Sequence, residues 1–272
     1  MIVAPYTYRQ GDRGRVVRDV QAKVGAKVDG LFGPKTDAAV RAYQAANGLA
    51  VDGIAGPKTL AAMGCELVAG IDVSHHNGAV DWAKVAGAGV AFAWSKASEG
   101  QTYRDKTART NVSGARANGV KVGVYHFARP EGSLADAEGE ARNLSSAMAT
   151  LGALDLPPVL DIESNPQKLT GAALVAWCAR FCEVTTALVG RRPVIYTFVG
   201  FLPLLATGDE LAGFPLWIAR LSSGNDPGPV APWTTWTAWQ QQIGPVPGCP
   251  TPTDRNWLAG GRAGLDALCA AP

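Results

Sequence analysis

From Leu67 onward, short apolar segments alternate with amphipathic segments of helical length, and this alternation restricts the fold more than any other feature of the chain. Short apolar runs bounded by turn residues are typical of buried strands, whereas apolar residues at every third or fourth position are typical of helices. A βα rhythm of this kind favours a parallel sheet covered by helices. The expected strands are 68–74, 90–97, 120–128, 156–163 and 192–198, and the expected helices between them include 103–118, 134–151 and 169–189.

Three further strands are expected at 215–220, 237–243 and 252–257. The segments that separate them, Ser222 to Trp236 and Gly244 to Thr253, are rich in Gly, Pro and Thr and leave little room for helices. We therefore predict an α/β fold for residues 67–272, an irregular TIM-like (β/α)5(β)3 barrel whose last three strands lack regular helices.

The first 66 residues contain an internal repeat. Residues 28–36 (VDGLFGPKT) align with residues 51–59 (VDGIAGPKT), and seven of the nine positions are identical. Asp-Gly and Gly-Pro mark turns, and Thr36 and Thr59 suit helix N-caps. A further helix upstream is indicated by apolar residues at helical spacing, namely Val16, Val17, Val20 and Val24. The pattern predicts a small three-helix module over residues 1–66, and by itself it requires only two similar helix hairpins, without a ligand.

Composition and charge exclude several classes of protein. Hydrophobic residues make up 47% of the chain and charged residues 18%, which is typical of a globular protein rather than a disordered one. The net charge of +2 is far from that of a nucleic-acid-binding surface, and no uninterrupted apolar run approaches the ~20 residues of a membrane span. The N-terminus lacks the pattern of a secretory signal. Five cysteines without metal-site spacing indicate synthesis in a reducing compartment, and they leave a Cys249–Cys269 bridge open.

Polar and aromatic residues gather at the carboxyl ends of the expected strands, where parallel barrels build their active sites. The candidates in chain order are Asp72, His75, Lys96, Tyr125, His126, Asp161, Glu163, Tyr196, Trp217, Trp239 and Asp254.

Asp161 and Glu163 have the clearest chemical meaning among these candidates. Residues i and i+2 of a strand point to the same face, so both acids would enter one space while Leu160 and Ile162 pack behind them. One protonated and one charged carboxyl group form the pair that a glycosidase needs. Taken alone, an Asp-x-Glu sequence is more often a strand-end cap followed by a solvated residue.

Several candidates have a structural interpretation as well. His75 and His76 would point in opposite directions on a strand, and their spacing is not that of a hydrolytic zinc site, so we expect no metal. Lys96 could pair with a neighbouring acid, and Glu99 is expected to be structural. Trp217 and Trp239 are equally compatible with core packing and with a flat platform for a sugar ring.

Seven segments resemble glycoside hydrolase family 25, the bacterial and phage muramidases. They are GIDVSHHNG (70–78), VDWAKV (80–85), KASEG (96–100), ANGVKVGVYHF (117–127), LPPVLDIE (156–163), VIYT (194–197) and PLWIA (215–219). The resemblance implies cleavage of the β-1,4 bond from N-acetylmuramic acid to N-acetylglucosamine, with an acidic cluster of Asp72, Asp161, Glu163 and Asp254. The first part similarly resembles the peptidoglycan-binding family 1 module, which implies anchoring to the cell wall.

The chain departs from the family 25 pattern near its end. It reads Trp239-Gln240-Gln241-Gln242 and Thr253-Asp254-Arg255-Asn256, where the family more often has Trp-Gln-Tyr and Val-Asp-x-Asn. Trp94 and Ser95 also replace residues that are usually aliphatic. We expect altered sugar or peptide contacts and retained catalysis.

The resemblance and the residues together lead to a mechanistic hypothesis. Glu163 is the general acid, because apolar neighbours and nearby Asp161 would raise its pKa. Asp161 stays ionised and orients the substrate's 2-acetamido group, whose oxygen attacks the anomeric carbon. Asp72 and Asp254 complete the electrostatics or position water, and contacts to the substrate come from His75, Lys96, Tyr125, His126, Tyr196, Trp217 and Trp239.

We therefore expect a peptidoglycan N-acetylmuramidase, a lysozyme, that acts as a monomer without cofactor, nucleic acid or membrane insertion. The favoured role is that of a phage endolysin, made in the host cytoplasm without a signal peptide and acting at the cell wall during host lysis. A bacterial autolysin of the same activity is the main alternative. A metal-dependent peptidoglycan deacetylase, a non-catalytic wall-binding protein and a peptide-cutting amidase are further rivals, and the amidase lacks a suitable zinc or Cys/His site in the sequence.

Overall fold

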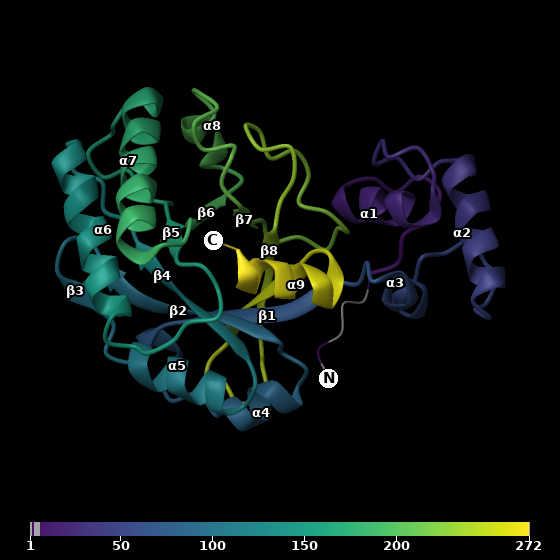
Figure 1. Cartoon of the computed structure of the whole chain (residues 1–272), viewed down its shortest axis with the longest axis horizontal. Helices are drawn as coiled ribbons and strands as arrows, with labels where there is room; N and C mark the ends of the chain where they lie inside the picture. Colours follow the sequence, from purple (N-terminus) through teal and green to yellow (C-terminus); the bar gives the residue numbers. More distant parts are fainter. Residues whose placement is uncertain (1, 3–5, 272) are drawn as a thin grey trace.

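The computed structural model describes residues 2 and 6–271, and it contains a closed eight-stranded barrel with a three-helix module beside it (Figure 1). The barrel strands are β1 (Val68–Val73), β2 (Phe92–Glu99), β4 (Lys121–Phe127), β5 (Val159–Asp161), β6 (Val194–Phe198), β7 (Leu216–Ala219), β8 (Ala238–Gly244) and β9 (Thr253–Leu258). Neighbouring strands pair in chain order, and β1 closes the barrel by pairing with both β2 and β9. The barrel strands β1, β2 and β4 to β8 run parallel, whereas β9 is antiparallel to both of its neighbours. The predicted irregular barrel is confirmed.

Helices cover the outside of the first five strands. They are α4 (Trp82–Gly87), α5 (Ala108–Ala117), α6 (Leu134–Met148), α7 (Gly171–Val189) and the short α8 (Leu202–Leu205), and a 3-10 turn η1 (His75–Asn77) follows β1. Among the described residues no helix lies between β7 and β8 or between β8 and β9, as the loop composition predicted. α9 (Gly261–Ala270), which follows β9, was not predicted.

The helix predicted over 103–118 starts later than expected. Tyr103–Arg104 forms a two-residue strand, β3, antiparallel to the end of β2. The carboxylate of Asp105 then accepts hydrogen bonds from the backbone N–H and the hydroxyl of Thr107, at 2.9 and 2.7 Å. A side chain that binds the backbone two residues ahead forms a turn, so α5 begins only at Ala108.

α7 is long and apolar enough to cross a bilayer by length and composition alone. In the barrel its buried face, which includes Leu174, Phe181 and Cys182, packs against α6 and α8. Trp177 on the same helix donates its indole N–H to Asp136 of α6 at 2.9 Å. These contacts are those of a core helix in a globular barrel. The five cysteines, including Cys249 and Cys269, are all unpaired.

The repeated segments of the module have the same hydrogen-bond pattern twice. The helices are α1 (Arg15–Val24), α2 (Pro34–Ala46) and α3 (Pro57–Met63). Gln21 donates to the carboxylate of Asp29 at 2.9 Å and to the hydroxyl of Thr36 at 3.1 Å. In the second repeat Gln44 makes the equivalent bonds to Asp52 at 2.8 Å and Thr59 at 3.2 Å. The repeated Asp and Thr residues are therefore used to close each loop onto the preceding helix.

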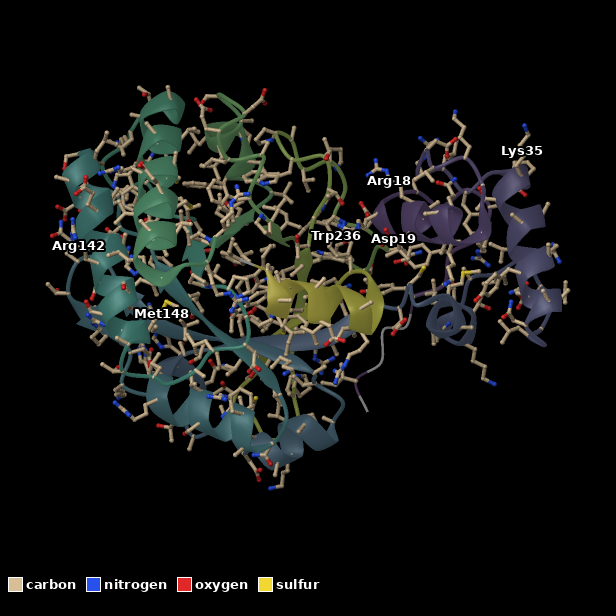
Figure 2. The ribbon with its side chains drawn as sticks, in the orientation of Figure 1. Arg18, Asp19, Lys35, Arg142, Met148 and Trp236 are labelled. Carbon is tan, nitrogen blue, oxygen red and sulfur yellow. The ribbon has the colours of Figure 1, made fainter. Side chains whose placement is uncertain are left out.

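The module contacts the barrel through the loop between β7 and β8. Asp226 of this loop accepts a hydrogen bond at 3.0 Å from the backbone N–H of Arg15, the first residue of α1, which no side chain of the module caps. The guanidinium of Arg15 donates to the Thr235 hydroxyl at 2.9 Å, and Arg18 donates to the Thr234 carbonyl at 3.2 Å. Figure 2 shows Arg18, Asp19 and Trp236 at this junction. The predicted boundary between residues 66 and 67 falls between the end of α3 and the start of β1.

Candidate active site

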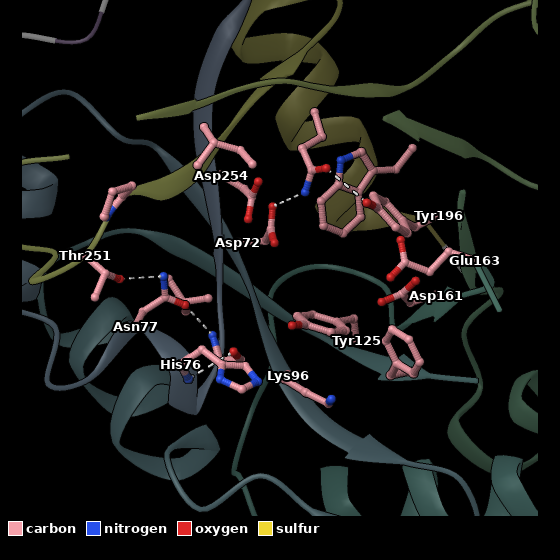
Figure 3. Close-up of a pocket in the computed structure, with 17 residues that line it drawn as sticks. Asp72, His76, Asn77, Lys96, Tyr125, Asp161, Glu163, Tyr196, Thr251 and Asp254 are labelled. Carbon is pink, nitrogen blue, oxygen red and sulfur yellow. Dashed lines mark hydrogen bonds between the residues drawn. The ribbon is translucent and has the colours of Figure 1, made fainter. Parts of the chain in front are cut away.

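A pocket of about 550 Å³ lies at the carboxyl ends of the parallel strands (Figure 3). Its walls combine carboxylates with aromatic rings, which is the surface that a sugar with polar edges and apolar faces requires. Of the residues predicted from the sequence, those that line it are Asp72, Lys96, Tyr125, Asp161, Glu163, Tyr196, Trp217 and Asp254.

Asp72 and Asp254 face each other across two antiparallel strands. They are direct partners in the register of β1 and β9, and Figure 3 shows their carboxylates side by side. Like charges in this arrangement repel each other. Burial, followed by the charge of Asp254, raises the pKa of Asp72 to about 7, and burial also raises the pKa of Asp254. A carboxylate pair that disfavours its own ionisation in a pocket is characteristic of a functional site.

Two side-chain amides hold Asp72 in place. Gln240 and Asn256 each donate an N–H to its Oδ2, at 2.9 and 2.8 Å. The orientation of both amides is determined by their other contacts, because the Tyr196 hydroxyl donates to the oxygen of Gln240 at 3.0 Å and the Trp217 indole donates to the oxygen of Asn256 at 2.8 Å. With Oδ2 accepting twice, a proton on Asp72 resides on Oδ1.

Asp161 and Glu163 enter the pocket from the end of β5. Leu160 and Ile162 between and behind them are fully buried, as the alternation predicted. Asp161 is 6% exposed, and its buried Oδ1 has no hydrogen-bond partner. Burial, then the charges of Glu163 and Asp72, raises the pKa of Asp161 well above its usual range.

Glu163 is half-buried beside Asp161, and burial and the charge of Asp254 raise its pKa. Lys96 acts in the opposite direction on both acids. Burial raises the pKa of Asp161 as well as that of Glu163, and the ionised state of Asp161 during catalysis stays a prediction. Two interacting carboxyl groups of this kind titrate as a pair and share a proton.

Three predicted substrate contacts lie outside the pocket. His126 is fully buried, with its ring nitrogens 2.8 Å from the Ser98 hydroxyl and 2.7 Å from a carboxylate oxygen of Glu140 on α6. It connects the barrel wall to a helix and cannot contact a sugar. Trp239 is also fully buried on the outer side of β8, where it stacks on Tyr6. Of the two interpretations of Trp239, core packing is therefore correct.

His75 is the third residue outside the pocket. Its Nδ1 is 2.7 Å from Asp105, and its neighbour His76 lines the pocket in its place. The reason is that residues 75–77 form a 3-10 turn rather than a continuation of β1, so strand alternation does not apply to them. The Ser74 hydroxyl and the Asn77 amide form a reciprocal capping box around this turn. That local Ser-x-x-Asn pattern is the signal in the sequence that could have identified the turn.

Lys96 has both of the roles that were considered for it. It lines the pocket, and its ammonium is 2.5 Å from a carboxylate oxygen of Glu99. The same ammonium lies 4.9 Å from the centre of the Phe127 ring. Lys96 thus supplies a fixed positive charge to a pocket with four carboxylates.

Substituting Asp72 with asparagine is expected to stabilise the protein at pH 8. Because the folded-state pKa is about 7, well above the ordinary value, the folded protein binds more protons than the unfolded chain between about pH 4 and 7. The free energy of unfolding therefore decreases as pH rises through this window. Asparagine cannot ionise, so for a shift from 3.8 to about 7 the variant should gain up to about 4 kcal/mol at pH 8 and little near pH 4. Thermal or urea unfolding at both pH values measures the difference.

Asp81→Asn provides a control of opposite sign for that experiment. Hydrogen bonds with Lys84 lower the pKa of the Asp81 carboxyl, so its charge stabilises the fold at neutral pH. Asparagine at position 81 should lower stability at pH 8. An Asp72→Asn variant that is equally stable or less stable than the wild type at pH 8 would contradict the repulsion between Asp72 and Asp254.

Comparison with known proteins assigns the barrel to a family. Residues 71–248, more than half of the chain, match the model of the glycosyl hydrolases family 25. The chain belongs to glycosyl hydrolase family 25. Residues 17–63 match the model of a putative peptidoglycan binding domain, so the family 25 barrel is joined to a module of a second known family.

Relatives of this family 25 chain include proteins named as lysozymes and muramidases. Lysozyme M1 of Streptomyces globisporus is 35% identical over 212 residues, which cover 74% of this chain and 71% of that protein. The N,O-diacetylmuramidase of Arthroderma benhamiae is 31% identical over 64% of this chain and 76% of its own length. The crystal structure of a bacterial lysozyme from Streptomyces coelicolor aligns with a TM-score of 0.67 and 33% identity, over 74% of this chain and 96% of that one.

Proposed function

We propose that this family 25 protein is a peptidoglycan N-acetylmuramidase that cleaves the β-1,4 bond from N-acetylmuramic acid to N-acetylglucosamine. The observation that carries the proposal is the pocket itself, in which Asp72, Asp161, Glu163 and Asp254 converge and all have raised pKa values. Glycoside hydrolysis by two carboxyl groups requires one that can hold a proton at neutral pH. The lysozyme and muramidase relatives support the same bond specificity.

Glu163 is the proton donor in this proposal. Its carboxyl group is more accessible than that of Asp161, it lies at the pocket wall beside Tyr196, and burial favours its protonated form. The proton passes to the glycosidic oxygen as the bond to the anomeric carbon breaks. Glu163, now ionised, accepts a proton from the water that completes hydrolysis.

Asp161 supports the attacking group. Its buried Oδ1 lacks a donor in the described part of the chain, and an unsatisfied buried oxygen is costly. The N–H of the 2-acetamido group of the sugar is a donor of suitable chemistry. Once that bond forms, Asp161 favours its ionised state, the shared proton moves to Glu163, and the acetamido oxygen is oriented toward the anomeric carbon. The product retains its anomeric configuration on this route.

Asp72 and Asp254 lie on the opposite side of the pocket, where whichever of the two is ionised contributes negative charge. The two amide donors keep Asp72 in one orientation, and Asp254 is its cross-strand partner. Fixed charges in a partly dry pocket stabilise the positive charge that develops at the anomeric carbon. We assign this electrostatic role to both residues.

Mass analysis of digested peptidoglycan is the experiment that tests the function. A muramidase produces disaccharide units with muramic acid at the reducing end. A deacetylase would remove acetyl groups and leave the glycan uncut, and an amidase would release free peptides. Product with N-acetylglucosamine at the reducing end would overturn the bond assignment, and an inverted anomer would overturn the acetamido route.

Removal of residues 1–66 is expected to reduce sedimentation with intact cell walls several-fold, while cleavage of soluble glycan fragments falls much less. The reason is that no residue of the module that the structure describes lines the catalytic pocket. Tyr6 packs against Trp239 and Trp257 of the barrel, so thermal unfolding of the truncated protein is the necessary control. Equal loss on walls and on soluble fragments, with the barrel folded, would contradict an anchoring role.

The biological setting stays a prediction. Both a phage endolysin and a bacterial autolysin would use the same bond cleavage and the same wall-binding module. We retain the endolysin role, with action at the cell wall of the host, as the proposal. Lysis of the producing cell only when a membrane-disrupting protein is co-expressed would support it, and lysis without such a protein would favour an exported autolysin.

A further inference from the structure

The hairpin of β8 and β9 forms a wall with two different faces. Strand alternation turns Gln240, Asp254 and Asn256 toward the catalytic pocket and its carboxylates. Arg255 and Trp257 point to the other side, into a second groove of about 1200 Å³. Ile243 lines both the pocket and the groove, so the two adjoin at this side chain on the rim of the hairpin.

This outer groove has a mixed apolar and polar lining. Leu221 and Ile243 at its edges are 60% and 52% exposed, so both present apolar surface to the groove. Val246 and Trp257 form an apolar base, and Gln242 is among the polar groups along the side. The lining suits a short chain with small apolar groups and hydrogen-bonding amides.

Arg255 supplies the charge of the groove. Its Nη2 donates to the carbonyl of Pro245, and its buried Nε has no partner. In the part of the chain that the structure describes, no carboxylate lies within ion-pair distance of this guanidinium. A guanidinium with an unsatisfied buried N–H is matched by a carboxylate, which it binds through a charge-assisted hydrogen bond.

We propose that the outer groove is a subsite for the peptide stem of peptidoglycan, with a stem carboxylate on Arg255 and alanine methyl groups against Val246 and Trp257. The inference rests on the proposed muramidase function, because the stem is attached to the muramic acid that occupies the adjoining pocket. The stem leaves the sugar, crosses the rim at Ile243 and enters the groove. The enzyme therefore prefers glycan that still carries peptide.

The test compares kcat/KM on two matched substrates, a glycan fragment with stem peptides and the same fragment after an amidase has removed them. For Arg255→Ala, the ratio of kcat/KM on the first substrate to that on the second should fall about tenfold, the loss of one charge-assisted hydrogen bond. For Arg255→Lys this ratio should fall less, since lysine keeps the positive charge but lacks the planar guanidinium. Arg262→Ala, an exposed arginine of α9, is the matched control and should leave the ratio unchanged.

A second variant tests the groove without removing a side chain from the β8–β9 hairpin, so its result does not depend on the folding of an Arg255 variant. Leu221→Glu places a negative charge at an exposed edge of the groove and should lower the same ratio by repelling the stem. An unchanged ratio in both Arg255→Ala and Leu221→Glu overturns the subsite, as does an equal loss on both substrates. A wild-type protein that cleaves neither substrate would instead overturn the muramidase function, so the two failures are distinguishable.

Discussion

Replacing Glu163 with glutamine is expected to lower kcat on peptidoglycan by about 10²–10⁴-fold, the usual contribution of a general acid. Glutamine has nearly the same shape but cannot donate a proton to the leaving oxygen. KM and sedimentation with intact walls should change little, because the variant keeps the pocket lining and the whole of the module. Release of reducing ends from purified glycan measures kcat, and a sedimentation assay measures binding.

Glu131→Gln is the matched control for Glu163→Gln. Glu131 is an exposed glutamate in the loop before α6, outside the pocket, and Glu131→Gln should retain full activity. The pH profile should change as well, because the upper limb of wild-type kcat reports the proton on the carboxyl pair. A Glu163→Gln enzyme that loses less than about tenfold in kcat would show that another group donates the proton.

Asp161→Asn is expected to reduce kcat by about 10²–10³-fold, comparable to the loss of one preorganised electrostatic contact. Asparagine at this site presents either an N–H or an uncharged oxygen to the acetamido group. It can no longer orient that group through a charged acceptor or stabilise the cationic ring that the group forms. The effect should be largest in kcat, since the charge matters most in the transition state.

Asp161→Asn also distinguishes attack by the substrate's acetamido oxygen from attack by the Asp161 carboxylate. On the acetamido route, a thiazoline analogue of the cyclised sugar should bind the wild type tightly and bind Asp161→Asn at least tenfold more weakly. Mass spectrometry of wild-type enzyme stopped during turnover should find no sugar attached to Asp161. A glycosyl ester on Asp161 would contradict the assigned role and make this carboxylate the nucleophile.

Several predictions that depend on residues close together in the sequence agree with the structure. Asp161 ends β5, and the chain continues past it with the Ile162 N–H bonded to the Tyr196 carbonyl at 3.0 Å, so Asp161 and Glu163 both reach the pocket while Leu160 and Ile162 stay buried. The loops after β7 and β8 lack helices in the described chain because glycine and proline oppose helix formation there. The repeat at residues 28–36 and 51–59 forms two equivalent loop closures, because Gln21 and Gln44 precede the repeated Asp and Thr residues by the same spacing.

Local rules failed where the chain left regular structure or where burial depended on a distant element. His75 was predicted as part of a strand end, but residues 75–77 turn into a 3-10 helix. His126 is adjacent to Tyr125, which lines the pocket, so strand alternation turns His126 outward, where Glu140 of α6 covers it. Trp239 lies on the barrel face that the N-terminal segment covers through Tyr6, a contact between the two ends of the chain.

The types and order of most elements, the family of the barrel and the four carboxylates at one rim were predictable from the amino-acid sequence. These follow from local backbone geometry and side-chain chemistry. Three features became visible in the folded barrel alone: Asp254 lies opposite Asp72, two oriented amides hold Asp72, and Arg255 points into a separate groove. The physical reason is that barrel closure pairs the first strand with the last, and burial, pKa and partners depend on that pairing rather than on neighbours in sequence.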